Sequence, residues 1–147
     1  MEKEEFFQVI SEFVPQITEE QKDKFYNYMN LLLEWNSKIN LTAITKPNEI
    51  IIKHFIDSMT ILKEINNRSK VIDVGTGAGF PGIPLKISND TLEIVLLDSL
   101  NKRIKFLNEV VEILELKKIS SIHFRVEEAG QNKQYREQFD VATSRAV

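Results

Sequence analysis

Asp73-Val74-Gly75-Thr76-Gly77-Ala78-Gly79-Phe80-Pro81 directly follows the apolar run Lys70-Val71-Ile72 in this chain of 147 residues. An apolar strand that ends in an acidic residue and then turns through alternate glycines is typical of doubly wound α/β sheets. Because glycine has no Cβ, the backbone can turn tightly and a ligand can approach the bare peptide groups. The segment therefore predicts a nucleotide-like cofactor at the carboxyl end of this strand.

The spacing of the glycines separates the possible cofactors. The dinucleotide pattern Gly-x-Gly-x-x-Gly requires a third glycine at position 80, where the chain has Phe80, and Pro81 lacks the N–H that binds a pyrophosphate. The triphosphate-binding loop does not fit either, because Gly82 precedes Ile83 and not a lysine. The spacing resembles the first motif of S-adenosylmethionine-dependent methyltransferases. A nicotinamide-dependent oxidoreductase and a turn that only joins strand to helix are the disfavoured alternatives.

A second strand pattern, at residues 93–98, is apolar and also ends in an acid. Asp98 lies 23 residues after Gly75, a separation that suits a carboxylate hydrogen-bonded to ribose hydroxyls from the neighbouring strand. NAD would use the same acid, so Asp98 indicates a cofactor without identifying it. A helix-capping region together with Ser99 is the plainer alternative.

The pattern of hydrophobic residues divides the chain near residue 68. Residues 1–68 are predicted to form an N-terminal helical extension, in which a capping box at 18–21 begins one helix and a second helix covers 47–65. Residues 69–147 are predicted to form a Rossmann-like domain, incomplete at its C-terminus, that alternates strands and helices. This alternation implies an α/β fold with helices on both faces of a parallel sheet. Its strands are expected near 70–74, 93–98, 121–126 and 139–143.

Composition excludes several other classes of protein. A net charge of −3 argues against a wholly electrostatic nucleic-acid binder. No apolar run approaches the ~18–20 residues of a membrane span, and the absence of cysteine suits a cytoplasmic protein. The two histidines, His54 and His123, are too few for a metal site. The cluster Lys102, Arg103 and Lys105 indicates a solvated helix face before it indicates a phosphate contact.

Five short motifs together carry a resemblance to a known family. They are Trp35-Asn36-x-x-Ile39-Asn40-Leu41-Thr42, His54-Phe55-x-Asp57-Ser58, the glycine-rich stretch 73–85, Asp98-Ser99-Leu100-Asn101-Lys102-Arg103, and Ser144-Arg145-Ala146-Val147. In this order they resemble the RsmG family, also called glucose-inhibited division protein B, from about residue 20 to the last residue. Its members transfer a methyl group from S-adenosyl-L-methionine to N7 of a guanosine in bacterial 16S ribosomal RNA. The resemblance implies a class I methyltransferase fold with strands in the order 3-2-1-4, and 16S RNA or the small ribosomal subunit as partner.

The resemblance also implies roles for individual residues. Asp98, Ser99 and Leu100 would surround the adenosine ribose, and Val126 with Glu127 would flank the adenine. Arg145 would lie where methyl donor and acceptor meet, as a positioning residue, although a surface ion pair is its default interpretation. The cofactor-binding residues implied are Gly75, Phe80, Asp98, Ser99, Leu100, Val126, Glu127 and Arg145.

Other polar residues of the motifs have plainer interpretations. His54 and Asp57 lie three residues apart on the predicted second helix, and a catalytic pair is one interpretation. A hydrogen-bonded pair that holds the helical extension against the sheet is the favoured one. Trp35 and Asn40 are interpreted first as packing and turn residues.

The chain is shorter than members of the resembled family, whose sheet has seven strands in the order 3-2-1-4-5-7-6. Only the first four can form here, so residues 139–143 are expected to be an open edge that invites self-association. The alternative function is accordingly a truncated, non-catalytic fragment that binds cofactor or associates with itself.

Overall fold

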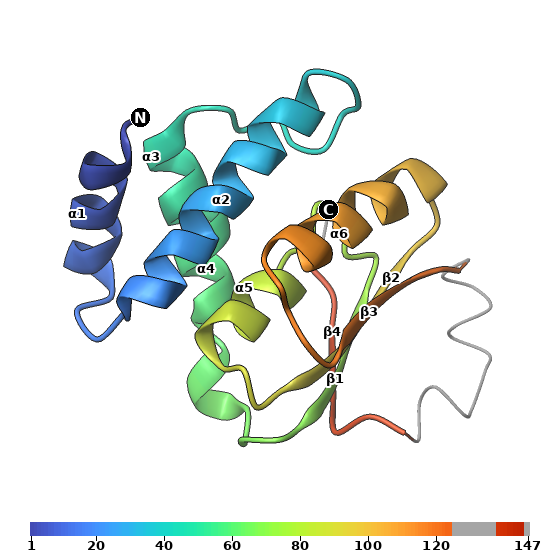
Figure 1. The fold of residues 1–147 in the computed structure, drawn as a ribbon. Helices are drawn as coiled ribbons and strands as arrows, with labels where there is room; N and C mark the ends of the chain where they lie inside the picture. The colour runs from blue at the N-terminus through green and yellow to red at the C-terminus, as the bar shows by residue number, and fades with distance from the viewer. Residues whose placement is uncertain (125–137, 146–147) are drawn as a thin grey trace.

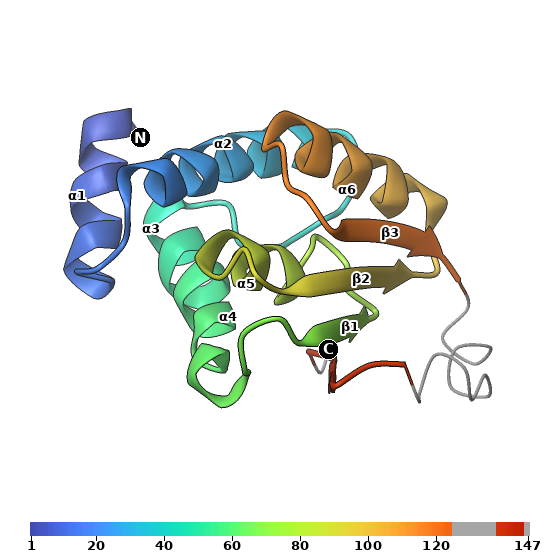
Figure 2. The same ribbon diagram turned by 60° about the horizontal axis from the view of Figure 1, so that its bottom comes forward.

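A computed structural model describes residues 1–124 and 138–145. Four parallel strands form one sheet in the order β3-β2-β1-β4 (Figures 1 and 2), which confirms the predicted order. The first two strands have the predicted bounds. The third begins at Ile119, two residues earlier than predicted, and ends at His123, while residues 125 and 126 of that prediction lie outside the described residues. The fourth begins at Val141, two residues later than predicted. The strands are β1 (Lys70–Val74), β2 (Glu93–Asp98), β3 (Ile119–His123) and β4 (Val141–Thr143).

Alternate residues of the strands point to opposite faces of the sheet. Val71, Ile94 and Leu96 are buried against the helices, and Ile72 with Leu97 forms a smaller apolar cluster on the other face. Figure 2 shows the helices of the described residues on one face only. The expected second helical face depends on the connection between β3 and β4, of which residues 125–137 lie outside the described residues.

Two helices connect successive strands of the sheet, and two more come from the N-terminal part of the chain. The helix α2 begins with the predicted capping box, in which Thr18 Oγ1 accepts from the Gln21 amide at 3.1 Å. The first helix was not predicted, although Phe6 and Ile10 lie four residues apart and are fully buried. These helices are α1 (Lys3–Phe13), α2 (Glu19–Asn36), α5 (Gly82–Ser88) and α6 (Asn101–Ile113).

The segment predicted as one α-helix over 47–65 has a π-helical middle. The amide of Asp57 bonds to the carbonyls of Ile52 and His54, in place of the regular i−4 partner. Hydropathy spacing does not reveal this change of hydrogen-bond pattern, so the prediction was wrong here. The segment contains α3 (Pro47–Glu49), the π-helix η1 (Ile50–Ile56), α4 (Asp57–Met59) and the 3₁₀ turn η2 (Leu62–Glu64).

One buried apolar cluster crosses the sequence boundary at residue 68. It joins Phe25 and Phe55 of the N-terminal part to Phe80 and Leu107 of the sheet domain. The helical extension is therefore packed on the sheet domain and shares its core. None of the described helices combines the length and the hydropathy that a membrane crossing requires.

Candidate functional site

The glycine-rich turn after β1 leaves open space above its first two glycines. Gly75, Gly77 and Gly79 have φ values of +67°, +59° and +102°, a region that only glycine adopts without strain. A Cβ added at Gly75 or Gly77 would meet no atom within 4 Å, whereas one at Gly79 would lie 2.7 Å from the Tyr28 hydroxyl. The turn is thus closely packed beneath Gly79 and accessible to a ligand at Gly75 and Gly77.

The carboxylate of Asp73 fixes the inner side of this turn. Its Oδ2 accepts from Thr76 Oγ1 at 2.7 Å and from the Gly82 amide at 2.9 Å, and its Oδ1 lies 3.4 Å from Thr143 Oγ1. Asp73 is fully buried, and this burial raises its pKa to about 7 against the effect of the three hydrogen bonds. One side chain therefore links the end of β1, the start of α5 and the end of β4.

Asp98, at the end of β2, fixes the outer side of the turn. Its Oδ2 accepts from the Gly77 amide at 2.8 Å, and its Oδ1 accepts from the Leu100 amide at 3.0 Å. Arg103 lies 3.5 Å from Oδ1, and Asp98 is only 1% exposed. The carboxylate thus organises the loop, while its predicted contact with ribose hydroxyls stays a prediction. Of its neighbours, Ser99 is exposed and Leu100 is 50% exposed beside it.

Phe80 packs into the core beneath the turn. Its ring is 5% exposed and stacks on the imidazole of His54 with ring centres 4.3 Å apart. Tyr28 also contacts this ring, and its hydroxyl donates to the Ala78 carbonyl at 2.5 Å. A cofactor above the turn would therefore meet the backbone of this region more than the Phe80 ring.

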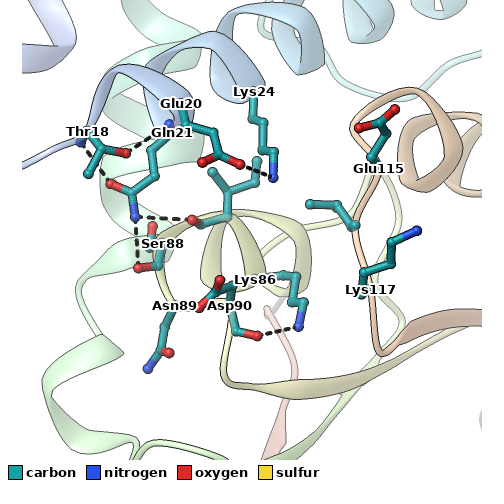
Figure 3. A pocket seen from close by; sticks show the side chains of 12 residues that line it. Thr18, Glu20, Gln21, Lys24, Lys86, Ser88, Asn89, Asp90, Glu115 and Lys117 are labelled. Atoms are coloured by element: carbon teal, nitrogen blue, oxygen red, sulfur yellow. Dashed lines mark hydrogen bonds and ion pairs between the residues drawn. The ribbon is translucent and has the colours of Figure 1, made fainter.

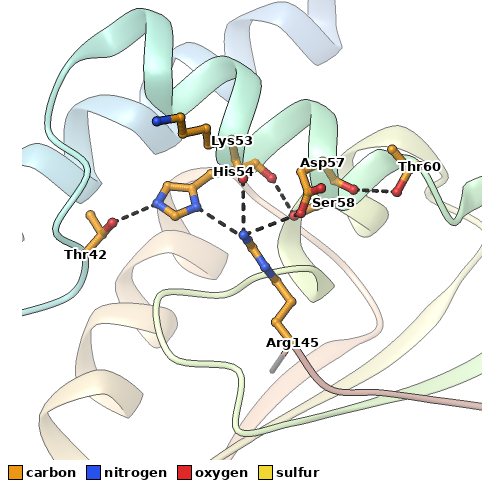
Figure 4. Close-up of polar contacts among 7 residues, drawn as sticks. All are labelled: Thr42, Lys53, His54, Asp57, Ser58, Thr60 and Arg145. Carbon is orange, nitrogen blue, oxygen red and sulfur yellow. Dashed lines mark hydrogen bonds and ion pairs between the residues drawn. The ribbon is translucent and has the colours of Figure 1, made fainter. Parts of the chain in front are cut away.

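Arg145 leads from β4 to the helical extension (Figure 4). Its Nη1 lies 3.4 Å from His54 Nδ1, and its Nη2 donates to the Lys53 carbonyl at 3.1 Å and lies 3.5 Å from Asp57 Oδ2. The guanidinium also lies 5.5 Å from the centre of the Phe80 ring. The proposed direct bond between His54 and Asp57 is absent from the described residues, because both side chains contact Arg145 instead.

Two cavities lie near opposite ends of the strands. One of about 350 Å³ lies at the carboxyl end of β4 and is lined by Pro81, Thr143, Arg145 and the segment around Asp57. The other, of about 510 Å³, lies between α2 and the N-terminal ends of β2 and β3, with Lys86 in its wall (Figure 3). Ligands of doubly wound sheets bind outside the carboxyl ends of the strands, so the first cavity belongs to the candidate site.

The structure brings together most of the residues predicted for the site. Gly75 follows the end of β1, and Asp98 at the end of β2 bonds to the amides of Gly77 and Leu100. Ser99 follows Asp98 in the chain, and the Arg145 guanidinium lies 5.5 Å from the centre of the Phe80 ring. Val126 and Glu127 lie outside the described residues. Asp73, Tyr28 and Thr42 were missed as site residues. Of these three residues only Asp73 had a signal in the sequence, because it directly precedes the glycine-rich stretch. Tyr28 and Thr42 come from distant segments of the chain.

No group of three or more metal-ligating His, Cys, Asp or Glu side chains occurs within residues 1–124 and 138–145. The described functional groups of the site include backbone amides, the carboxylates of Asp57, Asp73 and Asp98, the Arg145 guanidinium and the His54 imidazole. Burial, followed by the nearby Arg145 charge, lowers the pKa of His54 to about 4, so this imidazole is neutral at physiological pH. The arrangement suits the binding and orientation of a ligand more than proton transfer.

Comparison with known proteins agrees with this geometry. The family model described as GidB, rRNA small subunit methyltransferase G, matches residues 21–147. Proteins named ribosomal RNA small subunit methyltransferase G from Clostridium botulinum and Desulforamulus reducens are 56% and 55% identical, over 90% and 89% of this chain. The chain spans 56% and 55% of their lengths.

A similar solved structure is a SAM dependent methyltransferase from Aquifex aeolicus. It is 25% identical and has a TM-score of 0.46 over 63% of this chain and 47% of that one.

The family match, in contrast, covers the glycine-rich turn, Asp98 and Arg145 within one continuous stretch, residues 21–147. The chain therefore belongs to the rRNA small subunit methyltransferase G family.

Proposed function

We propose that the protein binds S-adenosyl-L-methionine above the glycine-rich turn and transfers its methyl group to N7 of a guanosine in 16S ribosomal RNA, in the cytoplasm. The observation that carries this proposal is the open space at Gly75 and Gly77, beside the carboxylate of Asp98. A cavity lined by Pro81 and Arg145 lies at the end of the neighbouring strand β4. The family supports an RNA of the small ribosomal subunit as the methylated molecule.

The residues around the turn fit this cofactor. The backbone at Gly75 and Gly77 accommodates a ligand because no side chain fills the space above it. Asp98 supplies a carboxylate at the end of β2, where ribose hydroxyls are bound in such folds. Leu100, with its side chain half exposed beside that carboxylate, offers an apolar surface next to the ribose.

The transfer makes few chemical demands on the protein. When bound, S-adenosylmethionine would supply a methyl group made electrophilic by the sulfonium; the sulfur–methyl bond breaks, its electron pair returns to sulfur, and S-adenosylhomocysteine is the leaving group. Guanine N7 has an in-plane lone pair, so it forms the new N–C bond without first losing a proton and needs no general base. The protein must therefore align the reacting atoms and exclude other geometries.

Arg145 is the described residue best placed for this alignment. It lines the cavity at the end of β4, and its guanidinium lies 5.5 Å from the centre of the Phe80 ring. A cation close to N7 would oppose the positive charge that develops on the base. We therefore assign Arg145 to the guanine O6 or to a phosphate, both of which accept hydrogen bonds from guanidinium.

The alternative is a cofactor-binding fragment without turnover. The chain spans 56% and 55% of the length of two of its relatives, and β4 pairs only with β1 among the described strands. Self-association through β4 stays a prediction of this alternative. Size-exclusion chromatography at a series of protein concentrations tests it, because self-association would raise the apparent mass as the concentration rises.

Calorimetric titration with S-adenosylmethionine tests the first step of the proposal. Saturable binding is expected, with none for NADH, and Gly75→Val should abolish it because its side chain enters the open space. Circular dichroism of the variant checks that the fold is retained. Incubation with unmethylated small ribosomal subunits should then give 7-methylguanosine in nuclease digests. Binding without any 7-methylguanosine would favour the fragment, and preference for NADH would refute the cofactor assignment.

A further inference from the structure

A single helical segment of the N-terminal extension supplies the described polar partners of the Arg145 side chain. The guanidinium contacts the Lys53 carbonyl, His54 Nδ1 and Asp57 Oδ2, all from this segment (Figure 4). Two of these residues lie in the π-helix η1, and π-helical turns are frequent at functional sites. Arg145 and His54 are 91 residues apart in the chain, so the fold alone creates this contact.

The hydrogen bonds around His54 define which ring nitrogen carries the proton. Thr42 Oγ1 lies 2.8 Å from His54 Nε2 and accepts from the Ile44 amide at 3.0 Å. A guanidinium has donors only, so the Nδ1 atom that faces Arg145 must be the unprotonated nitrogen. The neutral tautomer with hydrogen on Nε2 satisfies both contacts, since it donates to Thr42 and accepts from Arg145.

The ring of His54 is itself held in place. It is 8% exposed and stacks on Phe80 with an interplanar angle of 11°. Thr42 is oriented in turn by Asn36, whose Oδ1 accepts from the Leu41 and Thr42 amides at 2.8 and 3.0 Å. A chain of fixed groups therefore runs from the end of α2 to the guanidinium.

Within the described residues, the contacts of Arg145 leave some of its donors unused. The described contacts engage at most three of its five N–H groups. The side chain is 34% exposed and lines the 350 Å³ cavity, a volume within the ~300–1,000 Å³ typical of small-molecule sites. The guanidinium can therefore donate further hydrogen bonds to an acceptor placed in this cavity.

We propose that His54 is a positioning residue for methyl transfer, whose neutral imidazole, oriented by Thr42, holds the Arg145 guanidinium beside the acceptor. This inference rests on the proposed function, because it assigns the cavity at β4 to the guanine. His54 does not touch the reacting atoms and exchanges no proton with them. It acts only through Arg145.

Four variants test this inference. His54→Phe keeps a ring on Phe80 and removes the acceptor Nδ1, while Arg145→Gln removes the guanidinium. Thr42→Val removes the hydroxyl that orients the imidazole, and Thr42→Ser is its matched control because it keeps that hydroxyl. For each variant, calorimetry gives the affinity for S-adenosylmethionine, and methylation of small ribosomal subunits gives kcat and KM.

The expected pattern is specific to positioning. His54→Phe and Arg145→Gln should each lower kcat by about 10- to 100-fold, the cost of misplacing reacting groups by about 1 Å. The double variant should lose no more than Arg145→Gln alone, and His54→Phe should change cofactor affinity no more than Arg145→Gln does. Thr42→Val should lower kcat, and Thr42→Ser should restore it. Nitrogen-15 spectra of the imidazole should show the proton on Nε2 in the wild type.

Three results would overturn the inference. Losses that multiply in the double variant would show that His54 acts independently of Arg145. A wild-type imidazole with its proton on Nδ1 would exclude the hydrogen bond from the guanidinium. A wild-type protein that binds S-adenosylmethionine but forms no 7-methylguanosine would refute the proposed function itself, and the positioning role with it.

Discussion

Asp73 should make the free energy of unfolding fall as the pH rises. Its pKa is about 7 in the folded chain, raised by burial from the ordinary value of 3.8. Between these values the folded chain binds more protons at this group than the unfolded chain does, so a rise in pH favours unfolding. At ~1.4 kcal/mol per pH unit, the decrease between pH 4 and 7 is on the order of 4 kcal/mol.

His54 has the opposite effect over an overlapping range. Its pKa is lowered from 6.5 to about 4 by burial and by Arg145. The unfolded chain therefore binds more protons at this group between pH 4 and 6.5, and folding becomes more favourable as the pH rises. The gain is roughly 3 kcal/mol. In the wild type the two dependences largely cancel below pH 6.5.

Replacement of Asp73 by asparagine should reveal the dependence of His54. The amide oxygen of the variant can accept from Thr76 and Gly82, its Nδ2 can donate to Thr143, and the group does not ionise. The free energy of unfolding of Asp73→Asn should rise by roughly 3 kcal/mol from pH 4 to 6.5, whereas that of the wild type changes little and then decreases towards pH 7.

Urea denaturation followed by circular dichroism, repeated across this pH range, measures both curves. Asp140→Asn is the matched control, because Asp140 is exposed and its Oδ2 accepts from the Lys70 amide at the other end of β1. Its curve should run parallel to that of the wild type. Parallel curves for Asp73→Asn and the wild type would refute the assignment of a near-neutral pKa to Asp73.

Three further substitutions test the packing around the site, each by urea denaturation. Tyr28→Phe should lower the free energy of unfolding by about 1–3 kcal/mol, because a buried loop carbonyl loses its donor; Tyr26→Phe, whose hydroxyl bond is 3.3 Å and partly buried, should cost less. Gly82→Ala should cost about 1–3 kcal/mol, since its Cβ would lie 2.3 Å from Leu96 Cδ2; an unchanged stability would contradict that packing. Thr18→Ala should cost about 1 kcal/mol by removing the cap of α2, and no loss would show that the cap is dispensable.

The sequence predicts the parts of this fold that local pattern controls. The bounds of β1 and β2 follow from apolar runs that end in Asp73 and Asp98, and the capping box marks the start of α2. The family membership was also predicted correctly from motifs in order, and with it the strand order. These features depend on short stretches whose residues carry the signal by themselves.

Contacts between distant segments were not predictable in the same way. Tyr28 appeared only as one member of an apolar helix face, yet its hydroxyl bonds to a loop 50 residues away. The π-helical turns at 50–56 change hydrogen bonding without changing hydropathy, so they place the Lys53 carbonyl where no periodicity would predict it. The shared partner of His54 and Asp57 likewise required the fold, because Arg145 lies in another part of the chain.

The helical extension is consequently part of the candidate site. The Tyr28 hydroxyl of this extension donates a hydrogen bond to the Ala78 carbonyl in the turn. The His54 imidazole stacks on Phe80, and its Nδ1 contacts Arg145. A chain cut at residue 68 would leave that carbonyl without its donor and Phe80 without its apolar cover, which costs free energy at the turn itself. The boundary at residue 68 thus separates two segments of sequence, whereas the geometry that would bind cofactor and acceptor depends on both.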